Sequence, residues 1–186
     1  QGRHPVVAAD LGLAVGRLRR ESRHLLRGED GAEVDRVRQH AIGVARDYIR
    51  HGMVDVALAG ASESVINYGT MKAWQALHVL SPEGCFPFAK KRNGTVLGEG
   101  AGILVLESLE HAQARGARIY AEWKGAGTSN DAFDMVAAAE DGRGIVRAMR
   151  RSLERGGIAL DAVDYINAHG TSTPLNDRVE TRAIRT

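Results

Sequence analysis

The sequence has very little cysteine, few aromatic residues and no long apolar run. Its single cysteine, Cys85, cannot form an internal disulfide, which excludes a disulfide-stapled fold and fits a reducing cytoplasm. No apolar run reaches the roughly 18 residues that a membrane-spanning helix needs. The formal net charge of the 186 residues is only +2, so overall charge gives no reason to expect nucleic acid or an anionic membrane as a partner.

The composition is typical of an α/β protein. Hydrophobic residues make up 44% of the chain, and its 22 glycines suit tight turns between strands and helices. The chain begins with Gln1 rather than Met, and it ends at Thr186 inside a helical pattern without a capping residue. We therefore expect both ends to be cuts through a longer protein.

Residues 1–39 differ from the rest of the chain because arginines crowd them and apolar periodicity is weak. A strand over 6–9 and a helix over 11–26 are the only elements that this segment suggests. No aromatic residues alternate with the arginines, so we interpret the segment as solvated rather than as a binding patch.

From His40 onward, apolar residues recur at the spacings of amphipathic helices and buried strands. The predicted helices are 40–49, 70–79, 108–115 and 144–154, with one more starting near Asn176, and the predicted strands are 54–60, 103–107, 119–128 and 163–168. In the second helix we expect Met71, Trp74 and Leu77 to point inward. The alternation of strands and helices predicts an α/β fold in which helices cover sheets.

Gly98, Gly100 and Gly102 have spacings like those of a dinucleotide-binding loop. That loop follows a strand and opens a helix, whereas these glycines precede a predicted strand, so we reject nucleotide binding. We expect them to allow close packing of backbones instead.

A histidine follows the predicted strand 163–168 and begins a run of small polar residues, His169-Gly-Thr-Ser-Thr-Pro174. An imidazole at the end of a strand, beside glycine and hydroxyl groups, is placed to act on a ligand lying against the backbone. The residues alone leave a core role and a catalytic role open. We expect Asp177 and Glu180 to cap and orient the helix that follows. No histidine pair has the spacing and carboxylate support of a metal site, so we predict no catalytic metal.

Residues 165–177 resemble the histidine motif of β-ketoacyl synthases, the condensing enzymes of fatty acid and polyketide synthesis. Residues 88–107, 55–63 and 40–43 resemble three further motifs of this family, in the family's order, and the details are similar to bacterial elongation-type and nodulation-type synthases. The resemblance implies a thiolase-like α/β fold with a five-layered αβαβα core, which is incomplete here. Residues 40–117 would end its first half and residues 118–186 would begin its second, after a divergent segment over 1–39.

The resemblance also implies a reaction and its residues. The family transfers an acyl group from acyl carrier protein to a cysteine, decarboxylates a malonyl thioester and joins the two, with no metal and with its substrates on the phosphopantetheine of the carrier. His169 would be catalytic, Thr171 and Thr173 would bind pantetheine, and Phe133 would line the substrate site. The implied partners are acyl carrier protein and a second subunit, in a homodimer or heterodimer.

The sequence departs from the family where the nucleophilic cysteine should precede His40. Asp35 stands at about that place, and the family's second histidine would fall beyond Thr186, so we expect this chain to be inactive alone. Cys85 lies in a turn rather than at a helix start, which argues against it as a substitute. One hypothesis is that residues 28–38 are read out of frame; other readings are a non-catalytic, chain-length-determining partner subunit and a pseudogene product.

Overall fold

The computed structural model describes residues 3–8, 32–134 and 137–186, and the side chains of residues 32–39 are outside that description. The predicted helix over 11–26 therefore lies outside the described residues. The chain forms two compact units. We name the first, residues 3–8, 33–62 and 101–124, the sheet unit, and the second, residues 63–100 and 125–186, the motif unit. The predicted division at residues 117/118 stays a prediction.

The sheet unit contains a four-stranded sheet in the order β2-β3-β1-β4. Its strands are β1 (Pro5–Ala8), β2 (Val56–Glu63), β3 (Gly100–Ser108) and β4 (Ile119–Glu122). The short strand β1 runs antiparallel to both β3 and β4. Strands were predicted at all four places, and the sheet confirms them with changed ends.

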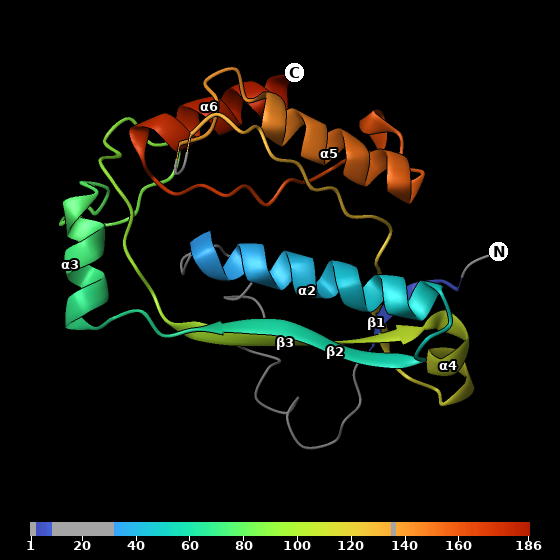
Figure 1. Ribbon diagram of the computed structural model, residues 1–186. Coiled ribbons are helices and arrows are strands. Elements are labelled where there is room, and N and C mark those ends of the chain that lie inside the picture. The colour runs from blue at the N-terminus through green and yellow to red at the C-terminus, as the bar shows by residue number, and fades with distance from the viewer. Residues whose placement is uncertain (1–2, 9–31, 135–136) are drawn as a thin grey trace. The chain divides into compact units, whose positions relative to one another are not determined.

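Helix α2 (Ala32–Arg50) lies along one face of this sheet (Figure 1). Its residues Ile42, Ala45 and Ile49 fall on one side at helical spacing and are buried against Ala59 of β2 and Leu106 of β3. This cluster is the apolar core of the sheet unit, and it confirms the helix predicted over 40–49.

A second helix of this unit, α4 (Leu109–Ala114), begins where β3 ends. The hydroxyl of Ser108 accepts the backbone N–H of His111 at 3.3 Å and so caps the helix. Ala112 is fully buried against Val6 and Ala8 of β1, so α4 closes a smaller apolar cluster.

Glycines of β2 and β3 show where two backbones approach each other closely. A Cβ added at Gly60 of β2 would lie 2.0 Å from the carbonyl oxygen of Gly102, so these two backbones touch. A Cβ at Gly100 would meet nothing within 4 Å. The prediction of close packing is therefore confirmed at Gly102 and is wrong at Gly100.

The motif unit is built of helices and irregular segments. It contains α3 (Tyr68–Ala76), α5 (Arg143–Gly156), the short 3-10 helix η1 (Leu160–Ala162) and α6 (Pro174–Arg185). Helices α5 and α6 lie side by side (Figure 1), and a Cβ at Gly142 would lie 3.1 Å from that of Ala183. Within the described ranges, no helix combines the length and apolarity needed to cross a bilayer.

Two of the predicted strands need correction. The strand predicted over 119–128 stops at Glu122, because the carbonyls of Gly125, Ala126 and Thr128 are bound by side chains of α5 instead of a neighbouring strand. A Cβ at Gly127 would lie 2.0 Å from the carbonyl oxygen of Ala148, so this segment packs directly on the helix.

The predicted strand over 163–168 is irregular in the structure. A strand needs a partner for its backbone N–H and C=O groups, and the described part of the motif unit provides no strand. Tyr165 is accordingly 76% exposed. In α3 the predicted inward residues Met71 and Trp74 are partly buried, whereas Leu77 is half exposed, so the predicted inward side is wrong at Leu77.

Candidate functional site

The predicted histidine lies in a loop whose backbone is held by two carboxylates. We name residues 169–173 the motif loop. Glu180 of α6 accepts the backbone N–H of His169 at 2.6 Å and that of Gly170 at 2.8 Å, one on each carboxylate oxygen. Asp177 accepts the N–H of Ser172 at 3.1 Å. Three backbone N–H groups of this loop are thus held by two carboxylates of one helix.

The helix presents both carboxylates because of their spacing. Asp177 and Glu180 are three residues apart and so share one side of α6, with Val179 and Ala183 buried nearby. Asp177 is 1% exposed and Glu180 is 6% exposed. The helix itself starts at Thr173 and Pro174 without a side-chain cap. The expectation that these acids cap the helix is therefore wrong, and the structure shows them holding the backbone of the motif loop, a role that was not predicted.

Asp177 also connects the motif loop to a second segment. Its other oxygen accepts the backbone N–H of Phe88 at 2.7 Å and lies 3.6 Å from Nε of Arg92. A buried carboxylate needs such donors and a counter-charge, because transfer out of water disfavours its ionised form. The segment 86–92 is consequently part of the site's support.

Ser172 also connects the motif loop to the segment 86–94 through hydrogen bonds. It is fully buried, and its hydroxyl accepts the N–H of Phe86 at 2.9 Å while its carbonyl accepts the N–H of Gly94 at 3.1 Å. Its φ of +65° is unusual for a residue with a side chain. The role of Ser172 was not predictable from the sequence, since its partners lie 86 and 78 residues away and leave no local signal.

Glycine is required at position 170. Its φ is +50°, and a Cβ there would lie 3.2 Å from Cβ of Pro87 and 3.3 Å from the ring of Phe88. The loop next to His169 is therefore packed closely against the segment that Asp177 and Ser172 hold.

The two predicted pantetheine-binding hydroxyls lie together. Thr171 Oγ1 and Thr173 Oγ1 are 2.8 Å apart, and both residues are partly exposed, as is His169. One hydrogen bond between two hydroxyls leaves each oxygen with capacity for a ligand. The structure thus brings His169, Thr171 and Thr173 onto one rigid loop.

Phe133, the fourth predicted site residue, lies in a different loop and is 57% exposed. Asp131 shapes that loop by accepting the N–H groups of Ala139 at 2.9 Å and Phe133 at 3.2 Å. These backbone hydrogen bonds, from Ala139 first, lower the pKa of the Asp131 carboxyl. The substrate-binding role of Phe133 stays a prediction.

Position 35, where the family resemblance predicts the nucleophile, is described only as backbone. Position 35 lies in the first turn of α2, where amide N–H groups point outward and would lower the pKa of a thiol. The sequence has aspartate there. Cys85 is partly buried in the turn before Phe86. Across the described residues, no group of three histidine, cysteine or acidic side chains could hold a metal ion.

Two family models match this chain. The N-terminal domain model of beta-ketoacyl synthase matches residues 39–112, and the C-terminal domain model matches residues 120–186. The chain belongs to the β-ketoacyl synthase family. Its histidine motif, with Ser172, Asp177 and Glu180 as support, lies within the second match.

Relatives and a solved structure agree with this assignment. Nodulation protein E of Rhizobium sp. (strain N33) is 53% identical over 146 residues, covering 78% of this chain and 36% of the relative. The 3-oxoacyl-[acyl-carrier-protein] synthase 2 of Rhizobium meliloti (strain 1021) is 45% identical over 183 residues, covering 94% and 43%. A type II polyketide ketosynthase, solved with its acyl-carrier protein as AntDE:AntF, superposes with a TM-score of 0.77 at 40% identity, over 79% of this chain and 38% of that one.

These matches show the fold to be that of the thiolase-like ketosynthases, present here in part. The chain spans roughly two fifths of the length of the proteins it matches, as their covered shares of 36 to 43% show.

Proposed function

We propose that this chain is part of a β-ketoacyl synthase, an acyltransferase that condenses an acyl thioester with malonyl-acyl carrier protein in fatty acid or polyketide synthesis. The observation that carries the proposal is the motif loop, in which Glu180 fixes the backbone at His169 and the hydroxyls of Thr171 and Thr173 lie 2.8 Å apart. The printed name of the relative from Rhizobium meliloti supports the reaction class.

In this proposal each site residue has a separate task. His169 hydrogen-bonds the malonyl thioester oxygen as decarboxylation builds negative charge there, which is an oxyanion-stabilising role. Thr171 and Thr173 bind the pantetheine arm, and Phe133 lines the acyl site. The substrates arrive on the phosphopantetheine of acyl carrier protein, and no metal takes part. Rigid support of the loop matters because small displacements of a catalytic group reduce rates strongly.

The proposed partners are acyl carrier protein and a second subunit, as a homodimer or heterodimer. The solved ketosynthase bound to its acyl-carrier protein supports the first of these. A cytoplasmic location belongs to the same proposal and depends on the single cysteine.

A second candidate function is a non-catalytic ketosynthase-like subunit that pairs with an active one. One observation favours it: the first turn of α2 carries Asp35, and Cys85, the chain's single cysteine, lies in a turn. An aspartate cannot carry a transferable thioester.

Binding of malonyl-pantetheine tests the loop assignment. Replacing Thr171 and Thr173 together by Val should weaken binding by about tenfold or more, because two hydroxyl contacts are lost. Thr186→Val, at the far end of α6, is the matched control and should bind as the unaltered chain does. Equal affinity for all three proteins, measured by titration calorimetry, would refute the assignment.

Intact-mass measurement separates the two candidate functions. After incubation with acyl-loaded carrier protein, we expect no acyl adduct on this chain. A covalent adduct removed by hydroxylamine would contradict the expected inactivity and favour the catalytic subunit. Co-expression with a cysteine-containing ketosynthase then tests the alternative, which requires a stable heterodimer.

A further inference from the structure

The sequence contains a single Asn-Gly dipeptide, Asn93-Gly94, and it lies in the segment that supports the motif loop. In such a dipeptide the backbone nitrogen of the glycine can attack the side-chain amide carbon of the asparagine, because glycine has no side chain to hinder the approach. The fold requires glycine here, since a Cβ at position 94 would lie 2.6 Å from the carbonyl oxygen of Val79. The close packing thus keeps a chemically labile pair at this place.

The reaction open to this pair is deamidation, and water completes it. The Gly94 nitrogen loses its proton and bonds to Cγ of Asn93, the bond from Cγ to Nδ2 breaks, and the amide nitrogen takes up a proton and leaves as ammonia. Water then opens the cyclic imide. Opening at Cγ gives aspartate with a normal backbone, whereas opening at the main-chain carbonyl gives isoaspartate, in which the backbone passes through the side chain and is longer by a methylene group.

In the folded chain the attacking nitrogen is both occupied and buried. Gly94 is buried and donates its N–H to the carbonyl of Ser172, in the motif loop, at 3.1 Å. Attack requires this nitrogen to lose its proton, and burial away from water disfavours the anion that results. The side-chain amide of Asn93 is held as well, since the hydroxyl of Ser81 donates to its Oδ1 at 2.6 Å. The folded structure therefore protects the dipeptide.

Release of the motif loop removes this protection. Asn93 is already exposed, so water reaches its side chain, and the N–H of Gly94 becomes free once Ser172 moves away. Positive charge next to the dipeptide then stabilises the anionic nitrogen, because the preceding residues are Lys90, Lys91 and Arg92. Deamidation is far slower than local opening, so its rate follows the fraction of time that the loop is released.

We propose that Asn93 is a deamidation site that becomes reactive when the motif loop leaves the segment 86–94, and that its isoaspartate product prevents the loop from returning. The longer backbone of isoaspartate displaces the Gly94 nitrogen, so its hydrogen bond to Ser172 cannot form again with the same geometry. A reversible opening is thereby made irreversible. The proposal depends on the hydrogen bonds of the loop and not on the condensing reaction, so the two can fail separately.

The rate of deamidation in the folded chain tests the protection. Mass spectrometry of the proteolytic fragment that contains Asn93 follows the conversion of amide to acid in the 186-residue chain and in a synthetic peptide with the sequence of residues 90–98. The folded chain should react at least about tenfold more slowly than the peptide at the same mildly alkaline pH. Equal rates overturn the proposal.

Variants that loosen the motif loop should speed the reaction. Ser172→Ala removes the hydroxyl that accepts the N–H of Phe86, and it should raise the rate at Asn93 by about threefold or more. Asp177→Ala removes the acceptor for the N–H groups of Ser172 and Phe88, and it should raise the rate by about tenfold or more. Where Asp177→Ala reacts as fast as the peptide because it has unfolded, Ser172→Ala decides. An unchanged rate in Ser172→Ala overturns the proposal.

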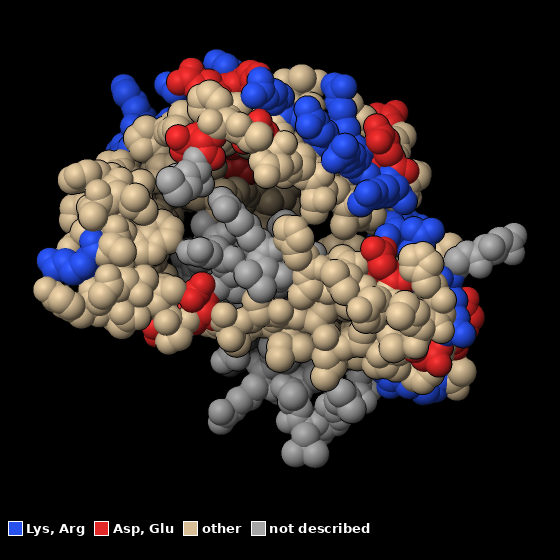
Figure 2. All heavy atoms as spheres, in the orientation of Figure 1, with Lys and Arg blue, Asp and Glu red and all other residues tan. Residues whose placement is uncertain are grey.

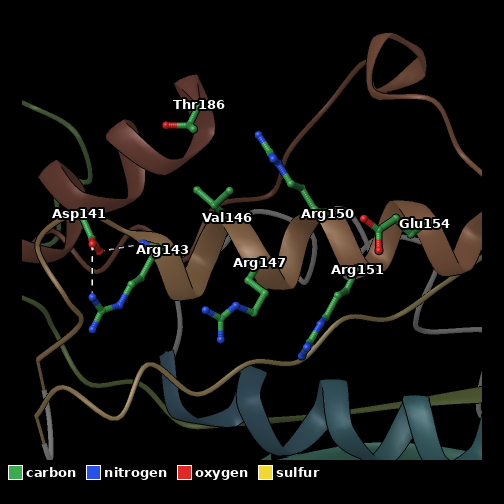
Figure 3. Close-up of a pocket in the computed structure, with 8 residues that line it drawn as sticks. All are labelled: Asp141, Arg143, Val146, Arg147, Arg150, Arg151, Glu154 and Thr186. Carbon is green, nitrogen blue, oxygen red and sulfur yellow. Dashed lines mark hydrogen bonds and ion pairs between the residues drawn. The ribbon is translucent and has the colours of Figure 1, made fainter.

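Two control variants locate the opening. Figure 2 shows basic side chains gathered along α5, and Figure 3 shows Arg151 among them, whose side chain donates to the carbonyl of Thr128 at 3.0 Å. Arg151→Ala loosens this other segment of the motif unit, and Leu106→Ala destabilises the sheet unit, so both should leave the rate at Asn93 within about twofold. Equal acceleration by Leu106→Ala and Ser172→Ala would mean that the amide reacts from the globally unfolded chain, which overturns the proposal.

Hydrogen exchange tests the irreversible step. The isoaspartyl chain carries an added carboxylate and can be separated from unaltered chain by ion exchange. Its backbone amides over 86–94 should exchange at least about fivefold faster than those of unaltered chain. Asn93→Asp is the matched control, because it adds the charge without the methylene group, and its exchange should stay within about twofold of the unaltered chain. Unchanged exchange in the isoaspartyl chain, or equally fast exchange in Asn93→Asp, overturns the proposed role of the longer backbone.

Discussion

Both units bury polar and apolar groups, but the apolar core of the sheet unit and the support of the motif loop depend on different kinds of side chain. The sheet unit is centred on apolar groups, with Ile49 and Leu106 fully buried between α2 and the sheet. In the motif unit the groups buried around the site are polar: Ser172, Asp177 and Glu180. The first arrangement tolerates small displacements because burial depends on area, whereas the second depends on donor and acceptor geometry. A loop that must hold a histidine and two hydroxyls in fixed positions benefits from buried hydrogen bonds, because their geometry is specific.

The two tryptophans allow the units to be followed separately. Trp74 belongs to the motif unit and Trp123 to the sheet unit. Variants that keep only one of them, with Phe at the other position, therefore report denaturant unfolding of one unit at a time. The predictions for Asp177 and Leu106 use these single-tryptophan variants.

The largest effect is expected from Asp177→Ala in the motif unit. It leaves the N–H groups of Ser172 and Phe88 without an acceptor and removes the counter-charge of Arg92, which should cost about 3–5 kcal/mol of unfolding free energy. The loss should appear in Trp74 fluorescence. Asp141→Ala, an exposed acid of the same unit, is the control and should cost less than about 1 kcal/mol. Similar costs for the two variants would remove the contrast between the units.

Leu106→Ala should produce the next largest effect, this time in the sheet unit. The side chain is fully buried, so the cavity and the lost transfer energy together should cost about 3 kcal/mol, seen through Trp123. Leu160→Ala provides the comparison, since that leucine is 72% exposed and its loss should change stability by less than about 0.5 kcal/mol. A small effect of Leu106→Ala would mean that the sheet unit does not depend on this core.

Gly127→Ala probes the contact between the segment 125–128 and α5. The added Cβ would meet the carbonyl oxygen of Ala148 at 2.0 Å, so we expect a loss of about 1–3 kcal/mol in denaturant unfolding. Gly100→Ala has open space at its Cβ and should be neutral or stabilising by less than about 1 kcal/mol. The reverse order of the two variants would contradict the close packing of this segment on α5.

The smallest effect is confined to acid pH and concerns the ion cluster around the buried Glu107 of the sheet unit. Arg115 first, and His111 with it, lower the pKa of the buried Glu107 carboxyl from 4.5. Because the folded pKa is depressed, the stabilisation is fully present above the unfolded value of about 4.5 and is lost as pH falls through the lower folded pKa.

Stability measured from pH 7 to pH 3 checks this dependence. The unaltered chain should lose stability below about pH 4.5, and Glu107→Gln should lose less over the same range. Glu110→Gln, an exposed acid in the adjoining helix α4, should follow the unaltered chain. An unchanged acid slope in Glu107→Gln would show that the cluster does not contribute.

Elements whose pattern is local were predictable. The 3.6-residue period over 40–49 is such a pattern, and the structure confirms the helix that it predicts. The cap at Ser108 and the glycine at 157, whose φ is +62°, also act within a few residues. The four ordered motifs likewise identified the family, since motif residues and their order are properties of the chain itself.

Elements that depend on distant partners were not predictable. The apolar run 163–168 has strand composition, but a strand forms only beside a second one, and α3 has helical periodicity without a surface that buries it.

The sequence by itself determined the family, the alternation of strands and helices, and the identity of His169, Thr171 and Thr173. Only the tertiary structure decided how that histidine's loop is held. Ser172, Asp177 and Glu180 take their roles from backbone groups at 86, 88, 94 and 169–172, several of them more than 70 residues away. Hydrogen bonds over such separations depend on where folding brings the backbone, and no local pattern of residues records that.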